Sequence, residues 1–371
     1  MNFKKDLPLT SSHWGTYRAK VKDGKVKELI GWENDKDPSP IGQGIVDVHN
    51  HQTRIDSPMI RKSWMDKGPG SNNSLRGTDP FISISWDEAE KIVSNELNRV
   101  KNDFGNASIF GGSYGWASAG RFHHAQSQLH RFLNCIGGYT RSKFTYSFAA
   151  AEAMVPHILG SYRAFLDTCT SWDSIEENTK LFICFGGVPL KNGQIAQGGT
   201  GSHKQKEKLI RSANAGIKFI NFSPLKSDLL DEVNGEWLAL RPNTDVAIML
   251  GLAHTLYKEK LYDDKFIEKY TEGFDTFLPY LLGDIDGIVK DANWASSISE
   301  IPSKKIISLA KEMSSKRTMI SVSWSLTRQD HGEQPFWAAI MLASMVGQIG
   351  LPGGGFGFGY SATNHIGGQF S

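Results

Sequence analysis

The feature that most constrains this chain of 371 residues is a regular alternation of short apolar runs with longer amphipathic segments in its second half. Apolar runs of strand length occupy residues 180–185, 217–222 and 317–324, and segments with helical periodicity lie between them. This alternation predicts a doubly wound α/β fold built on a mostly parallel sheet. In such a sheet, ligands bind beyond the carboxyl ends of the strands, where polar or glycine-rich loops are found here.

The first half of the chain predicts a different organisation. Alternating residues on both sides of Asp23-Gly24 predict a β-hairpin, and Ser85 with Glu88 forms a capping box that opens a helix ending at Gly105. A short strand is expected at 107–110, followed by the loop "FGGSYGW" and a second helix. We therefore expect a β-rich region at 1–60, an α/β domain at 61–170 that carries this loop, and a doubly wound α/β domain at 171–371.

Composition excludes several classes of function. The net charge of +2 is too small to create a broad positive field that would attract nucleic acid or anionic lipid. The three cysteines, Cys135, Cys169 and Cys184, show no CxxC spacing, so neither a disulfide framework nor a cysteine-ligated metal site is encoded. The amino terminus lacks the apolar region of an export signal, and the longest apolar run is too short to span a bilayer. We expect a cytoplasmic protein, or a periplasmic one if an export signal was removed or lies outside this chain.

Histidines suggest one alternative function. "GIVDVHNHQ" places His49 and His51 two residues apart after an apolar run, as in the metal sites at strand ends of amidohydrolases. Such a site needs further ligands at later strand ends, which carry glycines instead. A surface turn is the favoured interpretation of the pair, and a metal-dependent amidohydrolase is the alternative.

Other polar positions have two interpretations each. Ser147 lies in no G-x-S-x-G elbow, so serine hydrolase chemistry is not indicated, and an N-cap of the helix that follows is the favoured interpretation of this residue. The loop at 325–334 is rich in hydrogen-bond donors, which suits a solvated turn or a phosphorylated cofactor. In "RPNTD", Thr244 is a candidate N-cap, and Asp245 is free to bond a base or a ribose.

The longer motifs carry a resemblance to a known family. The strings "SSHWGTYRAKV", "RIDSPMIRKSW", "GSYGWASAGRFHHA", "NTDVAIMLGLAHTLY" and "HGEQPFWAAIMLASMVGQIGLPGGGFG" follow one another in an order and spacing that resemble the molybdopterin oxidoreductases of the DMSO reductase, trimethylamine N-oxide reductase and biotin sulfoxide reductase group. Relatives in this group are longer. The resemblance therefore implies a truncated chain, the amino-terminal half of such an enzyme, without the carboxyl-terminal cofactor domain. It also implies that residues 171–371 form a Rossmann-like dinucleotide-binding domain.

The resemblance implies a bis(molybdopterin guanine dinucleotide) molybdenum cofactor and a reductase used in anaerobic respiration. An oxygen atom would pass from a small S-oxide or N-oxide to Mo(IV), and two electrons and two protons would then release it as water. Biotin or methionine sulfoxide, DMSO and trimethylamine N-oxide are the candidate substrates. An inactive fragment is a further alternative. No iron–sulfur cluster is implied, so electrons would come from an external cytochrome or reductase protein.

The same resemblance assigns site residues. Ser147 matches the serine that ligates molybdenum, and a hard alkoxide suits a high-valent metal. Tyr114 and Trp116 match aromatics that line the metal funnel, where a phenol and an indole can donate hydrogen bonds. Contacts to the rest of the cofactor are implied for Trp14, Gly15, Ser113, Asn192, Pro224, Asp245, Arg328, His331 and Gln334.

Overall fold

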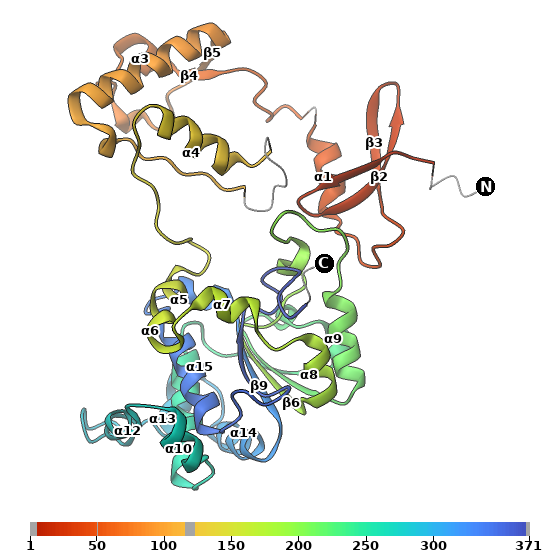
Figure 1. Cartoon of the computed structure of the whole chain (residues 1–371), viewed down its shortest axis with the longest axis vertical. Helices are drawn as coiled ribbons and strands as arrows, with labels where there is room; N and C mark the ends of the chain where they lie inside the picture. Colours follow the sequence, from red (N-terminus) through yellow and green to blue (C-terminus); the bar gives the residue numbers. More distant parts are fainter. Residues whose placement is uncertain (1–5, 50, 116–122, 369–371) are drawn as a thin grey trace. The chain divides into compact units, whose positions relative to one another are not determined.

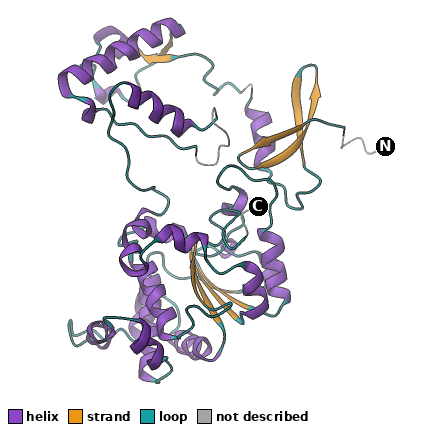
Figure 2. Ribbon diagram, viewed as in Figure 1, coloured by secondary structure: helices purple, strands orange, loops and turns teal. Residues whose placement is uncertain are grey.

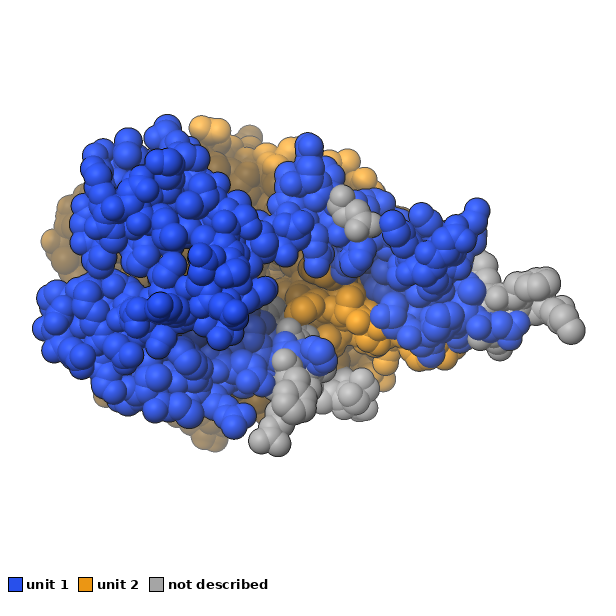
Figure 3. All heavy atoms as spheres, turned by 90° about the horizontal axis from the view of Figure 1, so that it is seen from above, with its two compact units in different colours: residues 1–10, 17–30, 40–143 blue, residues 11–16, 31–39, 144–371 orange. Residues whose placement is uncertain are grey.

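The computed structural model describes residues 6–49, 51–115 and 123–368 and divides the chain into two compact units. Unit 1 comprises residues 1–10, 17–30 and 40–143, and unit 2 comprises residues 11–16, 31–39 and 144–371 (Figure 3). Each unit is described separately below. None of the helices in the described part of the chain is long and apolar enough to cross a membrane.

A small three-stranded sheet forms near the amino terminus, with the order β1 (Leu9–Ser12), β2 (Gly15–Lys22), β3 (Lys25–Gly31) (Figure 1). Asp23 and Gly24 both have positive φ, 52° and 71°, as the two central residues of a type I′ turn require. The turn matches the twist of the flanking strands, so the predicted hairpin is confirmed.

The remainder of unit 1 is mainly helical. Strands β4 (Met59–Arg61) and β5 (Phe81–Ser83) pair antiparallel, and helix α3 (Trp86–Phe104) follows them. Ser85 and Glu88 form the predicted capping box, and α3 ends at Gly105 with φ 79°. The other elements of this unit are α1 (Ile41–Val48), α2 (Lys62–Lys67), α4 (Ala125–Cys135) and the 3₁₀ helices η1 (Asn73–Leu75) and η2 (Asn106–Ser108).

The strand predicted at residues 107–110 is wrong. Residues 106–108 form the 3₁₀ helix η2, and Phe110 makes only an isolated bridge with Thr140. A strand requires a continuous partner, and the chain beyond Phe110 turns away into a glycine-rich segment after this single bridge.

Unit 2 contains the predicted parallel sheet. Its five strands have the order β10 (Gly355–Phe358), β9 (Thr318–Val322), β6 (Leu181–Phe185), β7 (Lys218–Phe222), β8 (Glu236–Leu238), and every neighbouring pair is parallel. Ile183 is in register with Ile220 on one side and Ile320 on the other. The fold class predicted from the alternation is therefore confirmed.

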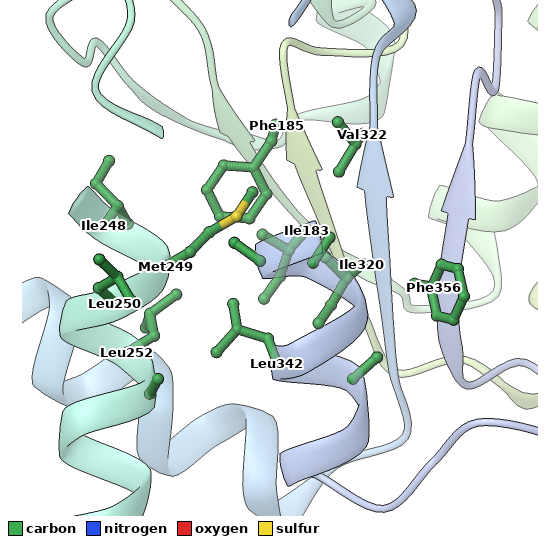
Figure 4. Packing of buried hydrophobic residues seen from close by; sticks show 14 of the residues in the cluster. Ile183, Phe185, Ile248, Met249, Leu250, Leu252, Ile320, Val322, Leu342 and Phe356 are labelled. Atoms are coloured by element: carbon green, nitrogen blue, oxygen red, sulfur yellow. The ribbon is translucent and has the colours of Figure 1, made fainter. Parts of the chain in front are cut away.

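Helices cover both faces of this sheet (Figure 2). On one face, Ile183 and Ile320 pack against α10 (Asp245–Lys258) and α15 (Gln334–Met345), as Figure 4 shows. On the other face, Phe182 and Phe219 pack with α8 (Trp172–Asn178) and α9 (Gln205–Asn214). Since a fully buried aliphatic or aromatic side chain contributes roughly 1.5–3 kcal/mol, these two cores make the sheet a rigid support for its rim.

The other elements of unit 2 connect these layers. They are α5 (Ala149–Met154), α6 (Pro156–Leu159), α7 (Tyr162–Asp167), α11 (Asp264–Tyr270), α12 (Phe274–Leu282), α13 (Ala292–Ser299), α14 (Ser303–Ser315) and the 3₁₀ helices η3 (Asn192–Gln194), η4 (Lys226–Asp228), η5 (Asp231–Val233) and η6 (Trp324–Arg328). Helices α13 and α14 pack against α10 and thicken the layer on its side of the sheet.

Candidate functional site

The carboxyl ends of the five parallel strands form the rim of unit 2. From β6 the chain passes to β7 and β8 on one side of the sheet, and later to β9 and β10 on the other side. The strand order therefore reverses between β6 and β9. In an open α/β sheet, this switch point is where a crevice for a ligand forms.

Two glycines follow β6 at the switch point. Gly186 and Gly187 have φ of 79° and 73°, a region that favours glycine. A Cβ on Gly187 would lie 2.4 Å from the carbonyl oxygen of Asp228, and one on Gly186 would lie 2.8 Å from Cβ of Ser323. Both glycines are therefore required for the loop after β6 to pack between the loops after β7 and β9.

Ser147 lies beside the turn that follows β9. Its carbonyl oxygen accepts a hydrogen bond from the hydroxyl of Thr327 at 3.2 Å. The next residue, Phe148, packs on Trp324, with 4.1 Å between the ring centroids. Ser147 does not cap α5, because that helix begins at Ala149 with Phe148 at its N-cap position. The half-buried serine is thus fixed by its neighbours at the carboxyl end of β9.

The loop after β9 carries three of the predicted contact residues. Arg328 ends η6 and is exposed, and His331 is exposed with φ 52°. Gln334 is the first residue of α15, and its amide donates a hydrogen bond to Glu333 at 3.2 Å. Of the three, Arg328 is linked to Ser147 through its neighbour Thr327, which lies in the same turn.

The loops after β6 and β7 carry Asn192 and Pro224, both exposed. The hydroxyl of Ser223 donates to Asp228 at 2.6 Å, and the ammonium of Lys191 donates to the same carboxylate at 3.0 Å. Asp228 therefore links the two loops. Sequence analysis missed it, since an aspartate in a polar loop gives no signal of a partner 37 residues away.

Asp245 begins α10 just after β8 and is only 2% exposed. Its Oδ1 atom has no hydrogen-bond partner in the described structure. Burial raises the pKa of this carboxyl to about 7. Thr244 occupies the predicted N-cap position, but its hydroxyl donates to the carbonyl of Arg241 and makes no capping bond. A buried carboxyl oxygen without a donor is costly, and a ligand N–H would satisfy it.

The remaining predicted residues fall in three places. Trp14 and Gly15 belong to unit 2, where Trp14 lies in the turn between β1 and β2 and Gly15 begins β2. Ser113 and Tyr114 lie in unit 1, where Tyr114 is 56% exposed and Ser113 donates to its carbonyl. Trp116 lies outside the described residues.

Glycine has a structural role in the same segment. A Cβ on Gly111 would lie 2.1 Å from Leu133 on α4, so a glycine is required where the loop meets this helix.

The structure does not support the metal site proposed for His49 and His51. Residues 41–48 form helix α1 rather than a strand, and His49 continues its helical backbone. The ring of His51 bonds the hydroxyl of Thr53 at 2.8 Å. Within the described residues, no group of three or more His, Cys, Asp or Glu side chains could hold a metal ion. The strand-end premise of the amidohydrolase alternative is therefore wrong.

Comparison with known families gives two matches. Residues 54–368 match the molybdopterin oxidoreductase family, and residues 10–48 match the molybdopterin oxidoreductase N-terminal domain. The resemblance expected from the sequence motifs is thereby confirmed.

Relatives with established names agree. The chain is 41% identical over 352 residues to the dimethyl sulfoxide/trimethylamine N-oxide reductase of Rhodobacter capsulatus. The match covers 95% of this chain and 42% of that protein. It is 43% identical over 338 residues to the biotin sulfoxide reductase of Cereibacter sphaeroides, covering 91% of this chain and 45% of that protein. The chain thus spans less than half the length of these relatives.

Among solved structures, the acetylene hydratase of Pelobacter acetylenicus is similar, with a TM-score of 0.57 and 19% identity. The match covers 92% of this chain and 44% of the hydratase. At this identity, the likeness concerns the fold alone.

Proposed function

Because the chain belongs to the molybdopterin oxidoreductase family, we propose that it forms part of a molybdenum-dependent reductase that removes an oxygen atom from small S-oxides or N-oxides. The family implies a molybdenum–pterin cofactor. We propose its bis(guanine dinucleotide) form, and a cytoplasmic enzyme that receives electrons from an external donor rather than from an iron–sulfur cluster in this chain.

The residues of the rim fit such a group. The orphaned, buried Oδ1 of Asp245 matches the N–H donors that a guanine base offers. Gly186 and Gly187 let the loops after β6, β7 and β9 pack closely at the switch point, which supports a defined rim there. This strand order supports the assignment of residues 171–371 as a dinucleotide-binding domain.

When bound, the molybdenum cofactor supplies the two-electron chemistry of oxygen-atom transfer. Ser147 would hold the metal through its hydroxyl oxygen, in a position maintained by Thr327 and by the Phe148–Trp324 ring contact. By the family resemblance, Tyr114 would donate its phenolic hydrogen to the oxygen of the substrate, and Trp116 would be a further aromatic contact to the substrate. A donor aimed at developing negative charge stabilises the transition state.

The other rim residues would bind and orient the pterin guanine dinucleotides. Arg328 and His331 are exposed donors in the loop after β9 and suit phosphate oxygens. The unpaired Oδ1 of Asp245 would accept a hydrogen bond from a guanine N–H. Smaller contacts would come from Trp14, Gly15, Ser113, Asn192, Pro224 and Gln334.

The observation that carries this proposal is the position of Ser147, which is hydrogen-bonded to the turn after β9 at the edge of the switch point. The test uses the protein as its gene encodes it, expressed in a host that makes molybdenum cofactor. We expect Ser147→Ala to abolish viologen-linked reduction of sulfoxides and to alter the molybdenum absorption spectrum. Ser142→Ala, an exposed serine in the segment before it, is the matched control.

Two results would contradict the proposal. Full activity with an unchanged spectrum in Ser147→Ala would remove the ligand role. Elemental analysis that finds no molybdenum in the unsubstituted protein would remove the cofactor assignment.

A further inference from the structure

A buried ion pair joins two segments of unit 2 that are distant in the sequence. His203 and Asp35 are 6% and 5% exposed, and 168 residues separate them in the sequence. Nδ1 of His203 lies 2.8 Å from Oδ2 of Asp35, and the backbone N–H of His203 donates to Oδ1 at 2.9 Å. The carboxylate therefore holds both the ring and the main chain of residue 203.

The second ring nitrogen also faces an acceptor. Nε2 of His203 lies 3.0 Å from the carbonyl oxygen of Gln194. A carbonyl oxygen can only accept, and a carboxylate can only accept, so both ring nitrogens must donate. The geometry thus requires an imidazolium that pairs with a carboxylate.

The pair holds the turn that carries Asn192. Gln194 ends the 3₁₀ helix η3 (Asn192–Gln194), so its carbonyl belongs to the same turn as Asn192. The side chain of Gln194 is bonded to the hydroxyl of Ser39 as well. The carbonyl of Gln194 is therefore tied to His203 and its side chain to Ser39, which lies in segment 31–39 with Asp35.

The pair also reaches the segment of Trp14 and Gly15. The backbone N–H of Asp35 donates to the carbonyl of Trp32 at 2.9 Å, and the N–H of Trp32 donates to the carbonyl of Thr16 at 3.2 Å. Thr16 directly follows Gly15. Three consecutive links therefore run from the imidazolium to the predicted contact at Trp14 and Gly15.

We propose that Asp35 and His203 are positioning residues, which lock segment 31–39 onto the loop after β6 and so fix two groups of cofactor contacts, Trp14 with Gly15 and Asn192. The locking is a property of the pair itself. Its role toward the cofactor rests on the proposed function. Removing one partner leaves the other buried without its counter-charge, which makes the lock cooperative.

The first test examines the pair in this chain without any cofactor. With ¹⁵N-labelled histidine, we expect both ring nitrogens of His203 to be protonated near neutral pH, with the resonance identified by its loss in His203→Gln. In Asp35→Asn, we expect one of them to lose its proton. A wild-type His203 ring with one unprotonated nitrogen overturns the ion pair, and this measurement on wild type does not depend on whether the variants fold.

The second test measures amide hydrogen exchange in segments 31–39 and 194–203. We expect Asp35→Asn to accelerate exchange there by at least about tenfold, since it removes the buried charge. Glu207→Gln is the matched control, because Glu207 pairs with Lys36 of the same segment at 3.4 Å but both side chains are exposed. Equal exchange in the two variants and wild type overturns the lock.

The third test uses the protein as its gene encodes it and compares pterin content. We expect Asp35→Asn to retain at least about tenfold less cofactor than Glu207→Gln after dialysis, with ring protonation and exchange measured in the same samples. Faster exchange with unchanged cofactor content overturns the positioning role. A wild-type protein without pterin overturns the proposed function and the positioning role, while the first two tests decide the lock separately.

Discussion

Replacing Asp245 by asparagine should stabilise this protein at neutral and alkaline pH. Asp245 is almost fully buried and has an oxygen without a partner, and burial raises the pKa of its carboxyl from 3.8 to about 7. At about 1.4 kcal/mol per pKa unit, that shift corresponds to a penalty of about 4 kcal/mol for the charged form. Asparagine has the same shape and carries no charge.

The sign of the pH dependence follows from the raised pKa. Between the unfolded and the folded pKa, the folded chain binds a proton that the unfolded chain releases, so the stability of wild type falls as pH rises through this window. The variant has no such loss. The difference in the free energy of unfolding should grow from near zero at about pH 4 to about 4 kcal/mol at about pH 8.

Urea denaturation followed by circular dichroism measures this difference at a series of pH values. Asp264→Asn is the matched control, because Asp264 is also the first residue of a helix, α11, but is exposed. A difference that does not change with pH, or a variant less stable than wild type at about pH 8, would refute the reasoning. If Asp245 reads a base, the stabilised variant should also retain less of the cofactor, which is the usual cost of a binding site.

Three other substitutions test separate parts of the structure. Gly187→Ala should destabilise unit 2 by roughly 1–3 kcal/mol in urea denaturation, because Gly187 has φ 73° and its new Cβ would lie 2.4 Å from the carbonyl of Asp228; an unchanged midpoint would show that the loop adapts. Ser85→Ala should cost α3 about 1 kcal/mol through the lost capping box, seen as faster amide exchange in the first turn, whereas uniform exchange along the helix would argue against the cap. Tyr114→Phe should shift the preference between S-oxides and trimethylamine N-oxide in steady-state kinetics of the protein as its gene encodes it, and identical kinetics on both substrates would remove this phenol from the proposed mechanism.

The features that sequence predicted correctly depend on neighbours in the chain. Asp23 and Gly24 form the hairpin turn, and Ser85 with Glu88 caps α3, because each structure is closed by residues within three positions. The buried runs of β6, β7 and β9 were predicted for a related reason, since a strand covered on both faces must be continuously apolar.

The errors and omissions involve partners that are distant in sequence. Residues 107–110 have strand-forming composition but find only one bridging partner. Serine favours the N-cap position, so the sequence predicts that Ser147 caps a helix. Instead, Phe148 packs on Trp324, 176 positions later, and occupies the N-cap of α5, which begins at Ala149. The buried partner of His203 lies 168 residues away, and no local pattern marks it.

Helix α3 shows the limit of periodicity as evidence. Its apolar positions recur with helical spacing, as expected, yet none of its 19 residues is buried in the described structure. Because most helices in proteins are stabilised by packing of an apolar face, the capping box and local ion pairs such as Arg99 with Glu96 contribute a larger share of the stability of this unburied helix. An apolar face therefore predicts that a helix has a surface suited to packing, but it does not identify the partner that packs there.

Two buried polar residues, His203 and Asp245, differ in whether their polar atoms have hydrogen-bond partners, a difference that their exposed fractions do not reveal. His203 is buried and both of its ring nitrogens have partners within the protein, so its chemistry is complete and it serves structure. Asp245 is equally buried, but one oxygen has no partner, and the fold tolerates the cost at the rim where strands end. Because a ligand donor that pairs with this oxygen would remove a penalty of about 1–3 kcal/mol, Asp245 is the residue to assign to binding.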